Sequence, residues 1–182
     1  MQFDATPLPG VYLLTPRVFG DERGFFMETW NAQVFADAGF DLSFVQDNHS
    51  RSARGTLRGL HYQTRHTQGK LVRVTQGSVY DVAVDLRRDS PTLGQVYGVM
   101  LDAREHRMLW IPPGFAHGFY VTSEIADFQY KCTDRYDPDS EISIAWNDPD
   151  LAIDWPLAND EAPSLSAKDQ KGLSFREAPR LR

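Results

Sequence analysis

The stretch KLVRVTQGSVYDVAVDL, residues 70–86, decides the fold class of this chain. Apolar residues alternate with polar ones in its first half, and three valines recur in its second half, a pattern typical of β-strands. Gln76-Gly77 lies between the two halves as a turn. A two-residue hairpin there would pair residue 72 with residue 81 and residue 70 with residue 83. The stretch therefore predicts antiparallel β-structure.

Short segments of the same kind continue on both sides, separated by Gly, Pro, Asn and Asp. Only Asn31–Ala38 has helical spacing, and Gly39 marks its end. Frequent turns between short strands favour an all-β sandwich or barrel with few helices. We predict strands at Val11–Phe19, Phe25–Trp30, Phe44–His49, Gly55–Gln63, Lys70–Thr75, Ser78–Leu86, Val96–Asp102, Arg107–Ile111, Phe115–Thr122, Phe128–Thr133 and Ile142–Trp146.

The length of the chain fits one domain. Its 182 residues, 20.7 kDa, can bury a sizeable core. We therefore expect residues 1–182 to form a single domain. Ala158–Pro163 and Gly172–Arg182 are polar, and we expect them to be loop-like, with the tail after about residue 172 mobile.

Composition and charge exclude several classes of protein. Lys and Arg number 19 against 25 Asp and Glu, a formal net charge of −6, which argues against a nucleic-acid partner. A local arginine cluster could still hold a phosphate.

A single cysteine, Cys132, excludes an internal disulfide and a Cys-based zinc site. No apolar stretch approaches the roughly 18 residues of a membrane span, and Met1–Asp4 does not look like a signal peptide, so we expect a cytoplasmic protein without a membrane partner.

Several polar side chains share strand faces with apolar ones. Alternate residues of a strand point to opposite faces, so Lys70 shares a face with Val72. In the predicted hairpin, Asp81 is a diagonal neighbour of Lys70 on that face. Parity alone does not decide whether this face is the interior or a solvated surface. A buried pair with a purely structural role is a further alternative.

His117 and Tyr130 have the same ambiguity. His117 shares the face of Phe119, and Tyr130 shares the face of Phe128. A single buried histidine or tyrosine is usually a core residue with a satisfied hydrogen bond. A packed core does not need four polar groups, however, so convergence with Lys70 and Asp81 in one barrel would indicate a site.

Arg58 and His61 are three positions apart, so a regular strand would send them to opposite faces. A bulge at Gly59 would bring them together. Without one, either Arg58 or His61 is a surface residue. Gln46 and Asn48 share a face; they could bind a base or sugar, or they could belong to a solvated strand face.

Residues 113–117, PGFAH, resemble the second motif of the cupin barrels, in which the histidine points inward. Many cupins bind a metal through this histidine, an H-x-H pair and a glutamate. The corresponding segment here, His61-Tyr62-Gln63, has one histidine. Because the ligands have the wrong type and number, we expect the fold without the metal.

A longer series of motifs closely resembles the dTDP-4-dehydrorhamnose 3,5-epimerase family over about residues 10–170. The resemblance implies a cupin-type jelly roll with a few short helices, a homodimer, and no metal or other cofactor. It also implies a substrate, dTDP-4-dehydro-6-deoxy-D-glucose, inverted at C3 and C5 to dTDP-4-dehydro-L-rhamnose. The motifs occur in order at residues 17–26 (RVFGDERGFF), 44–50 (FVQDNHS), 57–63 (LRGLHYQ), 68–73 (QGKLVR), 81–85 (DVAVD), 113–119 (PGFAHGF) and 130–133 (YKCT).

The resemblance also implies roles for individual residues. His61 is similar to the catalytic base and Tyr130 to the general acid of the family. Asp169, in the segment LSAKD, is similar to the carboxylate that orients the base. Lys70 corresponds to the residue near the C4 oxygen of the substrate, with Asp81 holding it.

Further residues correspond to substrate contacts of the family. Arg58 and His117 resemble pocket residues around the sugar and phosphates, and Gln46 and Asn48 resemble nucleotide contacts. The family places three more residues in the pocket of the neighbouring subunit, and they correspond to Phe19, Arg23 and Glu28. Tyr136 is a second tyrosine near Tyr130, so the identity of the acid stays open.

These residue types suit the chemistry. The C3 and C5 protons are removable only if the enolate next to the C4 ketone is stabilised, which a lysine can do. Histidine is a suitable base near neutral pH, and inversion needs a second acid on the opposite face. Two alternatives remain: a related cupin acting on nucleotide sugars, such as a single-site epimerase or a ketoisomerase, and a non-catalytic binder. A binder would not exchange substrate hydrogen with solvent.

Overall fold

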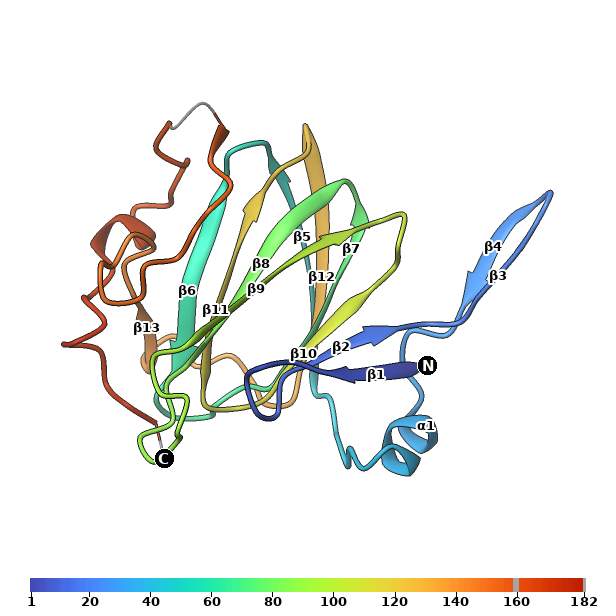
Figure 1. Cartoon of the computed structure of the whole chain (residues 1–182), viewed down its shortest axis with the longest axis horizontal. Coiled ribbons are helices and arrows are strands. Elements are labelled where there is room, and N and C mark those ends of the chain that lie inside the picture. Colours follow the sequence, from blue (N-terminus) through green and yellow to red (C-terminus); the bar gives the residue numbers. More distant parts are fainter. Residues whose placement is uncertain (159–160, 182) are drawn as a thin grey trace.

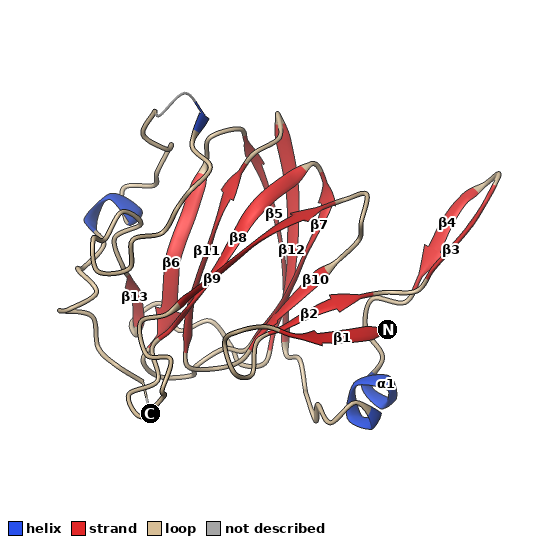
Figure 2. Ribbon diagram, in the orientation of Figure 1, coloured by secondary structure: helices blue, strands red, loops and turns tan. Residues whose placement is uncertain are grey.

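The computed structural model describes residues 1–158 and 161–181, and within them two antiparallel sheets face each other beside a separate hairpin (Figure 1 and Figure 2). The six-stranded sheet has the order β1 (Gln2–Ala5), β2 (Tyr12–Thr15), β10 (Met108–Ile111), β7 (Lys70–Gln76), β12 (Ile125–Cys132), β5 (Gln46–Ala53). The five-stranded sheet has the order β13 (Glu141–Ser143), β6 (Leu57–Gln63), β11 (Phe115–Val121), β8 (Ser78–Asp85), β9 (Val96–Asp102). The prediction of an all-β, cupin-type jelly roll is confirmed.

The main core lies between the two sheets. Alternation places Val72 of β7 and Phe128 of β12 on the inner face of one sheet, opposite Ala83 and Phe119 of the other. Lys70, Tyr130, Asp81 and His117 have the same parity as these core residues. The face that sequence parity left undecided is therefore the interior.

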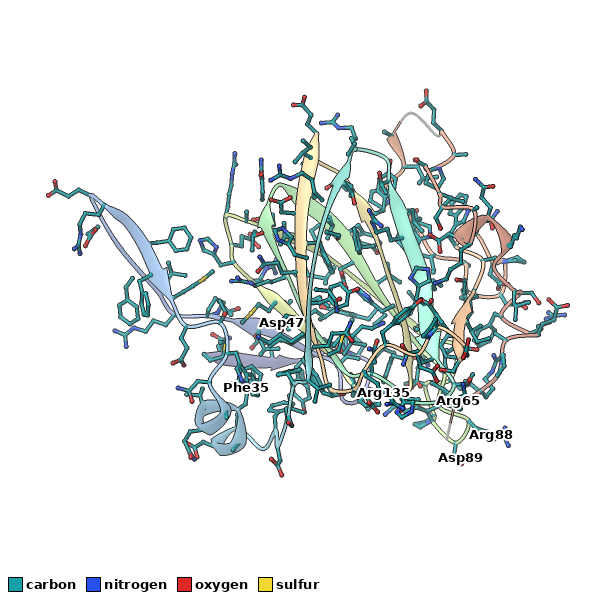
Figure 3. The ribbon with its side chains drawn as sticks, turned by 180° about the vertical axis from the view of Figure 1, so that it is seen from behind. Phe35, Asp47, Arg65, Arg88, Asp89 and Arg135 are labelled. Carbon is teal, nitrogen blue, oxygen red and sulfur yellow. The ribbon has the colours of Figure 1, made fainter. Side chains whose placement is uncertain are left out.

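Chain segments cover part of the outer face of each sheet. The N-terminal segment and helix α1 (Ala32–Asp37) cover the six-stranded sheet, and Phe35 projects from α1 into that cluster (Figure 3). Asn31 caps the helix by accepting hydrogen bonds from the backbone of its first turn. The C-terminal segment, which includes the 3-10 helix η2 (Asp169–Lys171), covers the five-stranded sheet.

The C-terminal segment is loop-like, as predicted, but it is packed. Ala178 and Leu181 are buried against the outer face of the five-stranded sheet. Residues 159–160 and Arg182, which belong to the segments predicted as loops, lie outside the described residues. Mobility of the tail stays a prediction.

The predicted hairpin between β7 and β8 is wrong. β7 pairs with β10 and β12, whereas β8 pairs with β9 and β11 in the other sheet. Gly77 turns the chain from one sheet to the other with a φ of +74°, and a Cβ there would lie 2.0 Å from the carbonyl oxygen of Ile125. Lys70 and Asp81 are therefore not neighbours on paired strands; they point into the interior from opposite sheets.

Some element boundaries also differ from the prediction. The expected strand Val11–Phe19 is interrupted and forms β2 and then β3 (Val18–Asp21), because Pro16 lacks the N–H that a continuous ladder needs. β1 is a strand that we did not predict. The expected strand Phe25–Trp30 is shorter and forms β4 (Gly24–Met27), which pairs with β3. No helix in the described residues is long and apolar enough to cross a membrane.

The β3–β4 hairpin, here called the arm, extends away from the two sheets (Figure 1). Its aromatic side chains are open to solvent in the isolated chain: Phe25 is 60% exposed and Phe26 is 71% exposed. An extended hairpin with exposed aromatic residues is typical of an interaction surface.

Candidate active site

A cavity of about 450 Å³ lies between the sheets, with the C-terminal segment as one wall. It is lined by residues of both sheets and of that segment: Ser50, Thr56, Leu57, Arg58, His61, Lys70, His117, Phe119, Phe128, Tyr130, Ser164, Leu165, Ser166, Lys168 and Asp169. Charged and aromatic groups from distant parts of the sequence thus meet in one place.

A bulge in β6 brings Arg58 and His61 to this cavity. β6 uses one residue more than β11 between the pairs His61–His117 and Arg58–Phe119. Gly59 lies in the bulge with a φ of +134°, and a Cβ there would lie 2.5 Å from the backbone of β11. The structure contains the bulge that the sequence left open as one of two alternatives, and it turns two residues of opposite parity to the same side.

His61 forms a pair with Asp169. The Nε2 of His61 lies 2.5 Å from Oδ1 of Asp169, whose side chain is almost fully buried. Burial acts to raise the pKa of Asp169, but hydrogen bonds from His61 and Ser166 outweigh it and hold this pKa below its usual range. With Nε2 bonded to the carboxylate, Nδ1 is the ring nitrogen available to accept a proton.

A second histidine–carboxylate pair lies in the same cavity. Nε2 of His117 lies 3.0 and 3.1 Å from the two carboxylate oxygens of Asp81, which is fully buried. The ring of His117 stacks on Phe128 with centroids 6.0 Å apart. The Asp81 carboxylate is hydrogen-bonded to His117 and also acts electrostatically on Lys70, so the expectation that Asp81 holds Lys70 stays a prediction.

Lys70 and Tyr130 belong to the six-stranded sheet and face the two histidines, which belong to the five-stranded sheet. Burial lowers the pKa of Lys70. Electrostatic interactions with Cys132, Glu141 and Asp81 act in the opposite direction but do not outweigh it. Burial raises the pKa of Tyr130, so its hydroxyl keeps its proton. The cavity therefore holds a hydroxyl donor on one side and imidazoles on the other.

Arg58, Gln46 and Asn48 surround the inner residues. The Nε of Arg58 donates to the Ser52 hydroxyl at 3.0 Å, which fixes the direction of the guanidinium. Gln46 and Asn48 share a face, as predicted, and are joined by a hydrogen bond of 3.1 Å. They line an adjoining hollow of about 300 Å³, which shares His61, Lys70 and Tyr130 with the main cavity.

Phe19, Arg23 and Glu28 do not approach this cavity within one chain. Phe19 and Arg23 lie on the arm, where Arg23 forms an exposed ion pair with Asp21. Glu28 follows β4 and accepts a hydrogen bond from Asn31 at 2.9 Å. The structure of a single chain thus brings the other predicted site residues together but leaves these three apart.

Sequence reasoning missed Glu141, Ser166 and Lys168. One carboxylate oxygen of Glu141 pairs with Lys168, and the other accepts the Tyr136 hydroxyl at 2.5 Å. That hydrogen bond raises the pKa of Tyr136 to about 12. Ser166 and Lys168 lie in the same LSAKD segment that pointed to Asp169, whereas Glu141 had no local signal, because β13 meets β6 only in the folded chain.

The described residues contain no group of three or more His, Cys, Asp or Glu side chains that could hold a metal ion. The expected independence from metal stays a prediction.

Comparison with known proteins identifies the family. The family profile described as dTDP-4-dehydrorhamnose 3,5-epimerase matches residues 5–177. The dTDP-4-dehydrorhamnose 3,5-epimerase of Pseudomonas aeruginosa is 61% identical over 172 residues, 94% of each chain, and that of Escherichia coli is 51% identical over 179 residues, 97% of this chain and 96% of its own. The solved structure of a dTDP-6-deoxy-D-glucose-3,5-epimerase from Legionella pneumophila, in complex with dTDP-4-keto-L-rhamnose, matches with a TM-score of 0.96 and 50% identity over 100% of this chain and 97% of that chain. The chain belongs to the dTDP-4-dehydrorhamnose 3,5-epimerase family.

Proposed function

We propose that this protein inverts C3 and C5 of dTDP-4-dehydro-6-deoxy-D-glucose to give dTDP-4-dehydro-L-rhamnose. The observation that carries the proposal, together with the family, is the arrangement of one cavity. His61 of one sheet, paired with Asp169 of the C-terminal segment, faces Tyr130 and Lys70 of the other sheet. An inversion next to a ketone needs a base, an enolate stabiliser and an acid on the opposite face, and this cavity can supply all three.

The first step is removal of a proton next to the C4 ketone. Nδ1 of His61 takes the proton from C3 or C5, and the electrons of the C–H bond move into the enolate. Asp169 stabilises the imidazolium that forms. Lys70 stabilises the negative charge that develops on the C4 oxygen.

The second step is reprotonation from the other face. Tyr130 gives its hydroxyl proton to the carbon, and the enolate collapses to the ketone with inverted configuration. The raised pKa of Tyr130, caused mainly by burial, keeps that proton on the hydroxyl until it is needed. His61 and Tyr130 then return to their starting protonation states through solvent. The reaction is redox-neutral, and the ketone already present in the substrate activates the C–H bonds, so the proposal includes no redox cofactor.

The nucleotide part of the substrate needs polar contacts outside the cavity. Arg58 is suited to the diphosphate, because its guanidinium offers paired donors. Gln46 and Asn48 offer amide groups in the adjoining hollow. His117 completes the wall around the sugar.

Two further parts of the proposal concern assembly and location. The protein acts as a homodimer in which the arm of each subunit brings Phe19, Arg23 and Glu28 to the nucleotide in its partner. The exposed aromatic residues of the arm support this assembly. It acts in the cytoplasm, which cell fractionation can test; the unpaired thiol of Cys132 is compatible with a reducing compartment.

The experiment that tests the function is hydrogen exchange. The protein is incubated with dTDP-4-dehydro-6-deoxy-D-glucose in deuterated water, and C3 and C5 are followed by NMR. We expect deuterium at both positions, together with inversion. Exchange at one position would indicate a single-site epimerase, and exchange at neither would remove the enzymatic function.

A further inference from the structure

Ser166 lies behind the base pair of the cavity, in contact with the carboxylate of Asp169. The two oxygens of this carboxylate have different partners. Oδ1 lies 2.5 Å from Nε2 of His61, and Oδ2 accepts a hydrogen bond of 2.8 Å from the hydroxyl of Ser166. His61, Asp169 and Ser166 therefore form a continuous chain of hydrogen bonds.

The contact between Ser166 and Asp169 is reciprocal. The hydroxyl oxygen of Ser166 accepts a hydrogen bond of 3.1 Å from the backbone N–H of Asp169, and the carbonyl of Ser166 accepts one of 3.1 Å from Gln170. This Ser-x-x-Asp turn leads directly into η2. Both the backbone and the side chain of Asp169 are thus held by one residue.

The Ser166 hydroxyl has two effects on the carboxylate. It prevents rotation of the carboxylate, which would carry Oδ1 away from His61. As a donor to an anionic oxygen, it also makes Asp169 a weaker proton acceptor.

The charged groups around the pair come from three elements. His61 faces Asp169 from β6, and Lys168 lies next to it in the C-terminal segment. Glu141 of β13 forms an ion pair with Lys168 and acts electrostatically on His61. Because Lys168 is engaged by Glu141, the direct donors to the Asp169 carboxylate are His61 and Ser166.

We propose that Ser166 is a positioning residue for proton transfer: its hydroxyl holds Oδ2 of Asp169, so that Oδ1 stays on Nε2 of His61 and Nδ1 is presented to the substrate. This inference rests on the proposed function, because it concerns the base of that reaction. Ser166 acts through Asp169.

The test compares Ser166→Ala with Ser166→Thr. The alanine variant loses the donor, so we expect kcat at the pH plateau to fall about tenfold, the equivalent of one hydrogen bond to a charged group. Without that donor Oδ1 is no longer held on Nε2 and stabilises the protonated imidazole less, so the acid limb of the kcat/KM profile moves to lower pH. Ser166 is exposed, and Ser166→Thr keeps a hydroxyl, so this variant should restore both properties.

Ser174 offers a matched control. Its hydroxyl donates to Glu177 at 2.6 Å and accepts from the backbone N–H of Glu177 at 3.3 Å, which is the same kind of turn outside the cavity. Ser174→Ala removes an equivalent hydroxyl–carboxylate contact. We expect it to keep the wild-type kcat and pH profile.

A readout without substrate separates this inference from the proposed function. NMR of labelled histidine rings should find the His61 proton fixed on Nε2 in the wild type and shared between both nitrogens in Ser166→Ala. An inactive wild type would contradict the proposed function and leave the NMR result to decide the inference. An active wild type with an unchanged kcat, pH profile and ring signal in Ser166→Ala would overturn the inference. It would also be overturned if Ser166→Thr were as impaired as Ser166→Ala.

Discussion

His61 and Tyr130 approach the cavity from opposite sheets, and this separation gives the proposed mechanism its stereochemistry. A proton taken on one side of the sugar ring can be replaced on the other only if base and acid do not share a side. The pairing of His61 with Asp169 at 2.5 Å and the burial of Tyr130 give the two residues different chemical characters. The residues that carry chemistry are thus distinguished by their environments.

Substitution of Tyr130 by phenylalanine tests this division of roles. The ring and its packing remain, and only the hydroxyl is lost. His61 should still form the enolate and return the proton to the side from which it came. We expect deuterium exchange at C3 or C5 to persist while inversion falls by about 10²–10⁴.

Two further variants serve as controls for Tyr130→Phe. His61→Ala should abolish both exchange and inversion. In Tyr136→Phe, exchange and inversion should remain coupled, because the Tyr136 hydroxyl is bonded to Glu141 at the rim. If Tyr136→Phe is the variant that separates exchange from inversion, Tyr136 is the acid and Tyr130 is not.

At the scale of elements, the bulge in β6 lets one strand contribute side chains both to the outer apolar cluster and to the cavity. Leu57, Leu60 and Tyr62 pack in the outer cluster beneath the C-terminal segment, while Arg58 and His61 line the cavity. A regular strand cannot place these five residues in this way, because its faces alternate strictly. The extra residue at the bulge resets the alternation.

Substitution of Gly59 by alanine should therefore be costly. Its φ of +134° disfavours a side chain, and a Cβ would lie 2.5 Å from the backbone of β11. We expect a loss of about 3 kcal/mol or more in the free energy of unfolding, and a loss of activity in any protein that folds. Thermal or urea unfolding measures the first effect.

Gly39 provides the comparison for this experiment. It also has a positive φ, +90°, but a Cβ there meets nothing within 4 Å. Gly39→Ala should cost only about 1 kcal/mol, because it carries the backbone strain without the clash. Equal losses in the two variants would show that close packing against β11 is not the reason for glycine at position 59.

The whole molecule consists of two facing sheets, a covering segment on each outer face, and the arm. The first two features bury apolar surface within the chain, whereas the arm leaves Phe25 and Phe26 exposed. A hairpin that pairs with no other strand and exposes aromatic residues is prone to associate in solution. Association with a second copy of the chain would bury these aromatic residues and would bring Arg23 to a cavity that it does not reach in its own chain.

The assembly can be tested by light scattering and kinetics. We expect about twice the chain mass of 20.7 kDa. Arg23→Ala should raise KM more than it lowers kcat, because Arg23 would contribute to binding of the nucleotide and not to proton transfer. A fully active monomer would contradict the shared site.

The sequence by itself determined most of the strands and which of their side chains share a face. Alternation is a local property with a period of two, so it could be read at β7, β8, β11 and β12 without knowing which strands pair. Gly59 between Arg58 and His61 pointed to a bulge as one alternative, because glycine in a strand can mark such irregularities, but the sequence did not decide between the bulge and a regular strand. The segments with the family's motifs also contain many of the residues that line the cavity, among them Arg58, His61, Lys70, His117 and Tyr130.

Only the tertiary structure decided which strands are neighbours. The turn at Gly77 looked like a hairpin, but β7 and β8 separate into different sheets, so Lys70 and Asp81 face each other across the interior. For the same reason Asp81 bonds to His117, and Glu141 meets Lys168. Strand pairing depends on how apolar faces fit together over the whole chain, and a local pattern contains no information about that fit.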